Sequence, residues 1–520
     1  MTDSRSQTPG VSRRLFSNTI LNFGGQGFIL VMTFVTAPYT VHHLGPELFG
    51  IVALVQTVAG FAGFLNLGIG RALTKYISEL YWKNDWEQIN NFFRTAWTTC
   101  LIAGTAGLIA IAGPRQMIGD AFFRGGSEVS SVTGYALFVA AFGLFTSMVL
   151  EVISAVPGAL QRFDLVNSVS VLGGIIRCVG PVVLLKMGYG VKSVLIVNLL
   201  SNIVSILVFA YLSHKLIPAL KFSPKFNKQA FAKLIGFSIP LFVSALSAII
   251  VARVDRFILA FYMPLAAVTF YTLPYSISEK LALGVGSIAS VVYPFASELH
   301  SREAHDKLQE LYIRASKLLV LVTLPFMTLL LAVPSSILKF WLGQEYASQG
   351  AVCLALLGIA TFLGAMSAVS TVTALGAGRA WMPASFAIAT SAVNLLANFL
   401  LIPRYGINGA ALGALVPQAV VVPVFIWKTT RDLQFSLGRV LLEALGRPFL
   451  CAGAQFAFLY LLQPFVTNLF QLLALCAASL AIFGVMALFI AASREEREEL
   501  FAQFSANRIL ARIGLSAESK

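Results

Sequence analysis

Long apolar runs alternate with short polar segments along almost the whole chain. A helix needs about twenty apolar residues to cross the roughly 30 Å hydrocarbon core of a bilayer. The period-two alternation that marks a strand of a membrane β-barrel is absent from the sequence. The pattern therefore predicts an all-α polytopic membrane protein with about 14 transmembrane helices, near residues 15–41, 48–68, 95–113, 131–155, 163–185, 191–213, 234–262, 267–296, 315–338, 348–375, 380–403, 407–427, 447–464 and 469–492.

Composition supports a membrane protein and argues against an enzyme. Of the 520 residues, 57% are hydrophobic and only 12% are charged, which lies outside the usual range of soluble globular proteins. The five cysteines stand singly in apolar runs, which predicts neither a disulfide framework nor a metal site. The sequence also lacks a Walker-type glycine loop and a nucleophile constellation. We therefore expect no catalytic residue, no metal and no cofactor.

The basic residues give the orientation of the chain. With the N-terminus placed inside, most of the 37 Lys and Arg residues fall in inner segments, as the positive-inside rule requires. The outer loops then hold only Arg115, Arg124, Lys186, Lys192, Lys339 and Arg404. Both termini are thus predicted to be cytoplasmic. The net charge of +14 becomes an inner-face bias that suits anionic lipid, and no nucleic-acid partner is expected.

Short motifs recur at an interval of about 215–220 residues. Residues 157–162 (PGALQR) are similar to residues 374–379 (ALGAGR), and Arg94 matches Arg314. Six spans per repeat give both halves the same orientation, and transporters built in this way bind substrate between the halves. We therefore expect two pseudo-symmetric six-helix lobes around a central cavity, followed by two extra helices. The predicted boundaries are 1–230 for the N-terminal lobe, 231–430 for the C-terminal lobe, 431–493 for the two additional helices and 494–520 for a cytoplasmic amphipathic tail.

Four further motifs follow one another from about residue 44 to residue 411. They are Leu44–Gly50 (LGPELFG), Leu65–Tyr76 (LNLGIGRALTKY), Arg253–Leu259 (RVDRFIL) and Ile402–Ala411 (IPRYGINGAA). In their order and spacing they resemble the polysaccharide-export (oligosaccharide flippase) branch of the multidrug/oligosaccharidyl-lipid/polysaccharide flippase superfamily.

This resemblance implies a fold and a function. The fold is two six-helix lobes around a cavity that opens to one side at a time. The function is translocation of a polyprenyl-diphosphate-linked oligosaccharide, such as an O-antigen, capsule or exopolysaccharide repeat unit, across the bacterial inner membrane. The implied partners are the lipid-linked oligosaccharide, membrane lipids and polysaccharide polymerase machinery. Fourteen spans are found among peptidoglycan-precursor flippases, whereas many O-antigen flippases have twelve, so the exact cargo stays open.

Three charged residues near the middle of predicted spans are the first candidates for the substrate site. Arg177 lies in the fifth span, and Glu279 and Lys280 lie in the eighth. A charge at the bilayer centre costs roughly 2.5–3.5 kcal/mol even on the lenient insertion scale, so these side chains should face the bundle interior or water. One of the two neighbours would pair with Arg177 or another residue, and the other would line the cavity. A buried structural ion pair is the alternative.

Other polar residues in the spans allow two readings each. In the motif of Arg253, Asp255 and Arg256, the two arginines share a face of the helix, and they either bind a diphosphate or extend to outer headgroups. The stripe of Asn18, Asn22 and Gln26 in the first span either contacts sugar or joins helices. Arg71 either receives the diphosphate or follows the positive-inside bias. Tyr271 and Tyr275 either stack on sugar rings or pack within the protein.

Three other functions compete with the oligosaccharide flippase. A cation-coupled multidrug exporter or a peptidoglycan-precursor flippase of the same superfamily is the nearest. The exporter would need an acid-lined cavity, whereas the predicted spans hold four bases (Arg177, Arg253, Arg256, Lys280) and three acids (Glu151, Asp255, Glu279). A membrane-embedded glycosyltransferase or polymerase usually carries catalytic acids in sizeable outer loops, and the outer loops here are mostly short. A membrane scaffold without transport is the last alternative.

Overall fold

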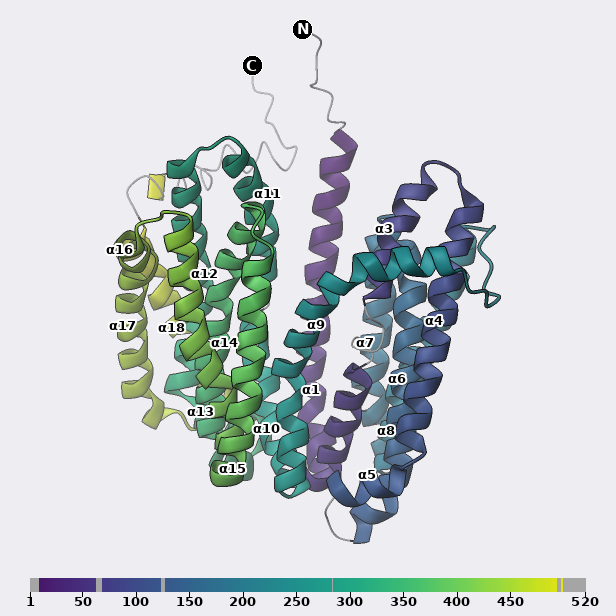
Figure 1. Cartoon of the computed structure of the whole chain (residues 1–520). Coiled ribbons are helices and arrows are strands. Elements are labelled where there is room, and N and C mark those ends of the chain that lie inside the picture. Colours follow the sequence, from purple (N-terminus) through teal and green to yellow (C-terminus); the bar gives the residue numbers. More distant parts are fainter. Residues whose placement is uncertain (1–8, 62–67, 123–126, 283, 493–496, 499–520) are drawn as a thin grey trace, which may run out of the picture. The chain divides into compact units, whose positions relative to one another are not determined.

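The computed structural model describes residues 9–61, 68–122, 127–282, 284–492 and 497–498, which are almost entirely helical and contain no strand (Figure 1). Eleven of the helices in this part are long and apolar enough to cross a membrane. The predicted all-α membrane fold is therefore confirmed. The count of fourteen spans stays a prediction, because two of the eleven, α1 and α15, each hold two predicted spans. The predicted amphipathic tail of residues 494–520 lies almost wholly outside the described part.

Contacts divide the chain into two units, and unit 1 consists of residues 1–273 with residues 387–413. In it α6 packs against α4 and α8, and α7 packs against α1 and α8. The helices of this unit are α1 (Pro9–Gly60), α3 (Ile69–Tyr81), α4 (Trp86–Ala112), α5 (Arg115–Phe122), α6 (Ser127–Ala159), α7 (Phe163–Lys186), α8 (Val191–Leu216), α9 (Lys228–Tyr262), the first part of α10 (Leu265–Glu279) and the middle of α15 (Trp381–Asp432).

Unit 2 consists of residues 274–386 with residues 414–520. In it α14 packs against α11, α12 and α13, and α17 packs against α12 and α18. Besides the rest of α10 and α15, its helices are the 3₁₀ turn η1 (Lys280–Ala282), α11 (Val285–Ser301), α12 (His305–Ala332), α13 (Pro334–Leu342), α14 (Gln344–Gly376), α16 (Leu437–Arg439), the π-helical η2 (Val440–Gly446), α17 (Arg447–Leu462), the 3₁₀ turn η3 (Gln463–Phe465), α18 (Leu469–Met486) and the π-helical η4 (Ala487–Ala491). The predicted division into lobes at residue 230 stays a prediction.

Two spans differ from the continuous helices that their apolar runs predict. The helix of the second span ends at Gly60, and the next described helix begins at Ile69 after Gly68, which has a left-handed φ of 72°. The eighth span is continuous only to Glu279, passes through the 3₁₀ turn η1, and resumes as a helix at Val285. An apolar run shows how far a segment extends through hydrocarbon, but it does not show where the helix is interrupted.

The turn after α6 has the same backbone geometry as the turn after α14. After α6, the N–H of Arg162 donates to the carbonyl five residues earlier (3.0 Å), and Gln161 has a φ of 56°. After α14, the N–H of Arg379 donates to the carbonyl five residues earlier (2.9 Å), and Gly378 has a φ of 75°. Both turns therefore close a helix with a left-handed residue and a hydrogen bond back to its last turn.

A second pair of turns matches in the same way. Before α4, the N–H of Asp85 donates to the carbonyl of Leu80 (3.3 Å) across Asn84, which has a φ of 54°. Before α12, the N–H of Ala304 donates five residues back in the same manner (3.0 Å) across Glu303, which has a φ of 55°. The two pairs of turns are separated by the interval at which the sequence motifs match, so the backbone repeats together with the sequence.

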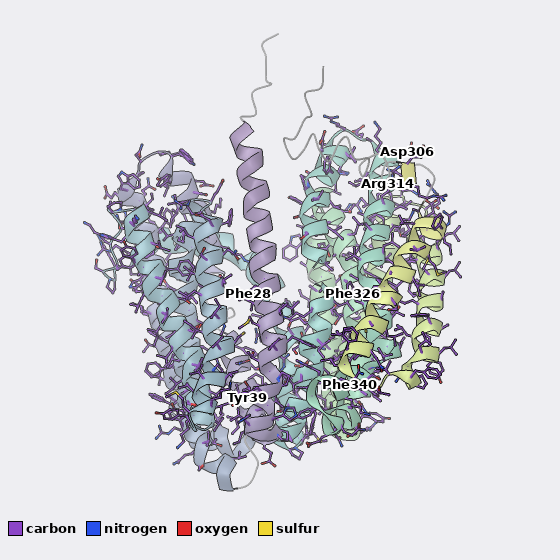
Figure 2. All side chains as sticks on the ribbon, turned by 180° about the vertical axis from the view of Figure 1, so that it is seen from behind. Phe28, Tyr39, Asp306, Arg314, Phe326 and Phe340 are labelled. Carbon is purple, nitrogen blue, oxygen red and sulfur yellow. The ribbon has the colours of Figure 1, made fainter. Side chains whose placement is uncertain are left out.

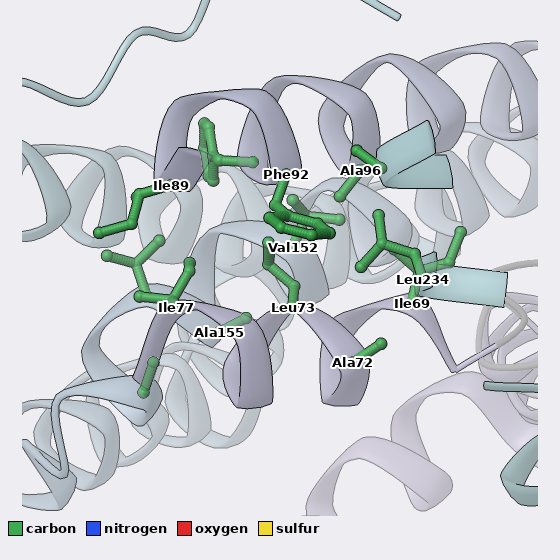
Figure 3. Close-up of a cluster of buried hydrophobic side chains, with 14 of the residues drawn as sticks. Ile69, Ala72, Leu73, Ile77, Ile89, Phe92, Ala96, Val152, Ala155 and Leu234 are labelled. Atoms are coloured by element: carbon green, nitrogen blue, oxygen red, sulfur yellow. The ribbon is translucent and has the colours of Figure 1, made fainter. Parts of the chain in front are cut away.

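A compact apolar cluster holds α3 onto unit 1. One face of α3 is buried, and its Leu73 and Ile77 pack against Phe92 of α4 and Val152 of α6. Leu234, near the start of α9, enters the same cluster from the side (Figure 3). The buried face follows the 3.6-residue period of an amphipathic helix. It leaves Arg71 exposed and Lys75 partly exposed on the opposite face.

Polar side chains join the two arms of α15 in unit 1. The helix reverses at Gly406, which has a φ of 56° and a ψ of −127°. Across this kink, Asn394 Nδ2 donates to the carbonyl of Gly413 (3.0 Å), and within the arm before the kink Asn398 Nδ2 donates to Asn394 Oδ1 (3.2 Å). A Cβ on Gly413 would overlap the amide of Asn398. Both asparagines are fully buried, and the close approach of the two arms gives the amide of Asn394 a hydrogen-bond acceptor on the other arm.

The additional helices α17 and α18 are attached to unit 2 by buried contacts. Gln455 of α17 donates from Nε2 to the carbonyl of Pro325 in α12 (3.2 Å) and to Ser479 Oγ of α18 (3.4 Å). Leu459 and Leu472 pack beside it on the end of α12. Along α12 the character changes from charged to apolar: Figure 2 shows Asp306 and Arg314 near one end of the helix and Phe326 farther along.

Candidate functional site

Arg177 is anchored on one side only. It lies on α7, and its Nη1 donates to Ser201 Oγ of α8 (3.0 Å), while Ser201 donates in turn to the carbonyl of Gly173 (2.9 Å). Gly173 leaves room for this arrangement, because a Cβ there would lie 3.3 Å from Nη1 of Arg177. The arginine side chain is exposed, and no carboxylate of the described residues lies within ion-pair distance. The geometry therefore holds a guanidinium in place by a neutral hydroxyl and leaves its charge available.

Asp255 and Arg256, for which the sequence leaves a role open, are both buried. Asp255 is 1% exposed and Arg256 is 7% exposed. The carboxylate of Asp255 accepts a short hydrogen bond from the hydroxyl of Tyr271 on α10, and it also accepts from the N–H of Arg256 (2.7 Å). Arg256 Nη1 donates to the carbonyl of Ala252 (3.0 Å). These groups form a buried polar cluster that joins α9 to α10.

Arg253 lies one turn from this cluster, at the end of α1. Its guanidinium occupies the space that a Cβ on Gly60 would take, and its positive charge acts on Asp255. Phe257, one turn farther along α9, packs edge-on against Phe61 (5.5 Å between ring centroids). A cation at the C-terminal end of a helix interacts favourably with its carbonyls. Arg253 therefore stabilises the point where the second predicted span is interrupted.

Glu279 and Lys280 form an ion pair with each other. Lys280 Nζ lies 3.9 Å from Glu279 Oε2, and both side chains are about half exposed. Neighbours on a continuous helix would point about 100° apart, but here the helix changes to a 3₁₀ turn between them. The expectation that only one of them would pair, and with another residue, was wrong for this reason. Both residues belong to unit 2, whereas Arg177 belongs to unit 1.

The remaining candidates lie on exposed surfaces where they are described. Arg71 is exposed in the first turn of α3, and Gln26 is exposed on α1. The side chains of Asn18 and Asn22 lie outside the described part of the structure. A Cβ on nearby Gly25 would contact Asn167 and Val171 of α7, so this part of α1 packs closely against α7.

Each unit also contains an apolar cavity. The cavity in unit 1 has a volume of about 330 Å³ and lies among α1, α4, α5, α6 and α9, with Phe61 and Phe257 in its wall. The cavity in unit 2 has a volume of about 280 Å³ and lies among α12, α14, α15 and η2, with Tyr312 and Trp427 in its wall. Neither is lined by a charged side chain, so both suit hydrocarbon and neither suits a sugar.

Sequence reasoning did not identify two contacts that hold the charged side chains in place. Ser201 is one of many serines in apolar runs, and only the packing of α8 on α7 brings it to Arg177. Tyr271 had been weighed as a sugar-stacking residue, but it is fully buried and donates to Asp255, so packing within the protein is the correct reading. Its distance of 16 residues from Asp255 gives no local signal of the contact.

Residues 43–350 match the family described as "Polysaccharide biosynthesis protein". The chain is 22% identical over 425 residues to a "Putative O-antigen transporter" of Shigella flexneri, covering 80% of this chain and 98% of that protein. It is 23% identical over 456 residues to a "Probable flippase AglR" of Haloferax volcanii, covering 86% of this chain and 89% of that protein.

Solved structures show where the same fold occurs. The lipid II flippase MurJ, in an inward closed conformation, matches with a TM-score of 0.72 and 18% identity over 90% of this chain and 98% of that one. An inward-facing multidrug resistance transporter of the MATE family matches with a TM-score of 0.65 and 16% identity over 78% of this chain and 94% of that one. At such identities the likeness concerns the fold alone.

Proposed function

Because this multi-pass membrane protein belongs to the polysaccharide biosynthesis protein family, in the flippase branch of its superfamily, we propose that it translocates a polyprenyl-diphosphate-linked oligosaccharide across the bacterial inner membrane by alternating access. The cargo would be an O-antigen, capsule or exopolysaccharide repeat unit. The similarity to an O-antigen transporter and to a flippase over most of their lengths supports this proposal. No bond is made or broken, so the protein acts as a transporter and not as an enzyme.

The single observation that carries the proposal is the state of Arg177. It lies 14 residues after the start of α7, which places it about 21 Å along the helix axis at 1.5 Å per residue. A charge at that depth needs water or an anion, because hydrocarbon cannot solvate it. Its partner, Ser201, is a neutral hydroxyl. We propose that the diphosphate of the cargo binds this guanidinium, which can donate two parallel hydrogen bonds to phosphate oxygens.

The surroundings of the charged side chains in the spans argue against a cation-coupled drug exporter. Such a protein needs acids in its spans that can bind a cation, but two of the three acids in the predicted spans are occupied: Asp255 by Tyr271 and the backbone of Arg256, and Glu279 by Lys280. Arg177 is a base without a carboxylate partner within the described residues. The apolar cavities fit the hydrocarbon part of a lipid-linked cargo.

Transport of a fluorescent lipid-linked oligosaccharide into vesicles that contain the purified protein tests the role of Arg177. Hydrogen bonds to charged groups contribute about 1.5–3 kcal/mol, so Arg177→Gln should slow transport about 10- to 150-fold. Arg177→Lys should give an intermediate rate, because it keeps the charge but not the planar fork. Folding should change little, since Ser201 can donate to or accept from a glutamine.

Arg162→Gln is the matched control, because Arg162 also lies on the α7 side of unit 1 but is exposed and paired with Asp164 (2.9 Å). It should transport at the rate of the unchanged protein. If Arg177→Gln transports as fast as the control, Arg177 has no part in substrate binding. If the unchanged protein does not move the lipid at all but moves cationic dyes, the proposed function is wrong.

A further inference from the structure

The segment of residues 217–236 links α8 to the first turns of α9 and is fixed to unit 1 by side chains of α4. The amide of Asn90 donates to the carbonyl of Ala219 (2.8 Å) and accepts from the N–H of Lys221 (2.8 Å). Arg94 Nε donates to the carbonyl of Ser223 (2.8 Å). The N–H of Asn227 donates to Thr95 Oγ1 (3.2 Å). We call this segment the linker, and its backbone path is set by α4.

Apolar side chains hold the other side of the linker. Ile217 and Leu234 are almost completely buried in the cluster of α3 and α4, and Figure 3 shows Leu234 there. Phe222 packs edge-on against Phe93 (5.3 Å between ring centroids) and Trp97 (6.0 Å). The linker thus has a buried apolar side, and Figure 1 shows the first turns of α9 running across α3 and α4. Its other side is left for solvent or membrane.

The exposed side of the linker is basic and lacks acids. Lys221, Lys225, Lys228 and Lys233 are all exposed, and none has an ion-pair partner among the described residues. The sequence contains no Asp or Glu between Asp164 and Asp255, so no acid is near in the chain. An unpaired cluster of like charges repels itself unless an external anion neutralises it.

The basic residues of other predicted inner segments are arranged differently. Several of them are paired with neighbouring acids, as in Lys75–Glu79 (3.7 Å), Arg162–Asp164 (2.9 Å), Arg302–Glu298 (2.8 Å), Arg314–Glu310 (2.7 Å), Arg379–Asp432 (3.3 Å) and Lys428–Asp432 (3.0 Å). The positive-inside bias alone would apply equally to all of these segments. The lack of acids is therefore a specific property of the linker.

An aromatic side chain projects among the lysines. Phe226 is 51% exposed, although Phe231 lies beside it (5.2 Å between ring centroids). An exposed phenylalanine in a basic segment that adjoins two membrane spans is typical of a surface that rests on the headgroup and acyl boundary. A water-soluble anion would bind the lysines but would gain nothing from Phe226.

We propose that the linker is a binding surface for anionic phospholipid headgroups of the adjacent leaflet. The four lysines contact lipid phosphates, and Phe226 enters the boundary between headgroups and acyl chains. The buried side of the linker holds these groups in the plane of the surface. This interaction is independent of the transported cargo, so it holds or fails separately from the proposed transport function.

Lipid binding to the purified protein in detergent, followed by native mass spectrometry, tests the proposal. Each lysine near an anionic surface strengthens binding about fivefold, so K221Q/K225Q/K228Q should lower the affinity for phosphatidylglycerol about 100-fold. Affinity for zwitterionic phosphatidylcholine should stay the same. The charge-preserving variant K221R/K225R/K228R should bind phosphatidylglycerol as the unchanged protein does. Phe226→Ser should weaken the binding of both lipids.

The matched control is K75Q/R302Q/K428Q, which removes the same number of charges from bases that have acid partners. It should lose little affinity. The proposal is wrong if the linker variant binds phosphatidylglycerol normally, or if the control loses as much affinity as the linker variant. It is also wrong if inorganic pyrophosphate displaces the lipid at equal concentration, because the site would then recognise a soluble diphosphate.

Discussion

Replacement of Asp255 by asparagine should weaken the fold and not the binding of cargo. The carboxylate is 1% exposed, accepts from Tyr271 and from the N–H of Arg256, and is acted on by the charges of Arg256 and Arg253. An asparagine of the same shape keeps one carbonyl oxygen but loses the negative charge. The two arginine charges then lose the carboxylate that compensates them inside the protein.

The size of the effect follows from this burial. Removing one partner of a buried charged pair costs about 3–5 kcal/mol. Tyr271→Phe removes only one hydrogen bond between helices, which averages about 0.6 kcal/mol in membrane proteins and reaches about 1.7 kcal/mol. Since both changes affect one hydrogen bond, the double variant should cost less than the sum of the two single variants.

The assay is equilibrium unfolding in mixed micelles with increasing dodecyl sulfate, followed by circular dichroism. Asp432→Asn is the control, because Asp432 pairs with Arg379 and Lys428 but its side chain is 22% exposed. Exposed pairs contribute about 0–1 kcal/mol, so the control should change little. If Asp255→Asn unfolds like the unchanged protein but no longer transports, the cluster belongs to the substrate site and its structural role is refuted.

Two further predictions concern helix packing in the membrane. Gly413→Ala should destabilise the protein by about 1–3 kcal/mol in the same assay, because its Cβ would overlap Asn398 and force the arms of α15 apart. Gly453→Ala is the control and should not destabilise the protein, because its Cβ meets open space. Equal stability of the two variants would contradict the packing argument. Gln455→Leu should lower the free energy of unfolding by less than about 1 kcal/mol. It removes two long hydrogen bonds at about 0.6 kcal/mol each but places an apolar side chain among Leu459 and Leu472. A loss of several kcal/mol would mean that Gln455 is essential for attaching α17 and α18.

The helical membrane fold could be predicted because hydrocarbon imposes a length and an apolar composition on each span. The same signal could not locate the interruptions at Gly60 and after Glu279. Both interruptions lie inside apolar runs. The helix ends there are stabilised by groups that are local or distant in the sequence, and Arg253 at Gly60 is a distant one. Glu279 and Lys280 were therefore assigned to a continuous helix, and the ion pair between them was missed.

The candidate site was predictable in its residue types but not in its contacts. The cost of charge in a membrane pointed to Arg177, and the charged motif late in the seventh predicted span pointed to Asp255. Neither argument could show that Arg177 is exposed beside a serine and that Asp255 is buried beside a tyrosine. That difference comes from helices that are distant in sequence. The proposed roles of Arg177, Glu279 and Lys280 in binding cargo stay predictions.

The paired turns at Gln161 and Gly378, and at Asn84 and Glu303, show that one dihedral angle can persist where the amino acids differ. Three of these four positions carry a side chain in a conformation that glycine adopts without cost. Glycine at residues 84, 161 and 303 would thus relieve steric crowding, at the expense of a more disordered unfolded chain. The two halves can accordingly be aligned on these paired turns, even where the amino acids differ.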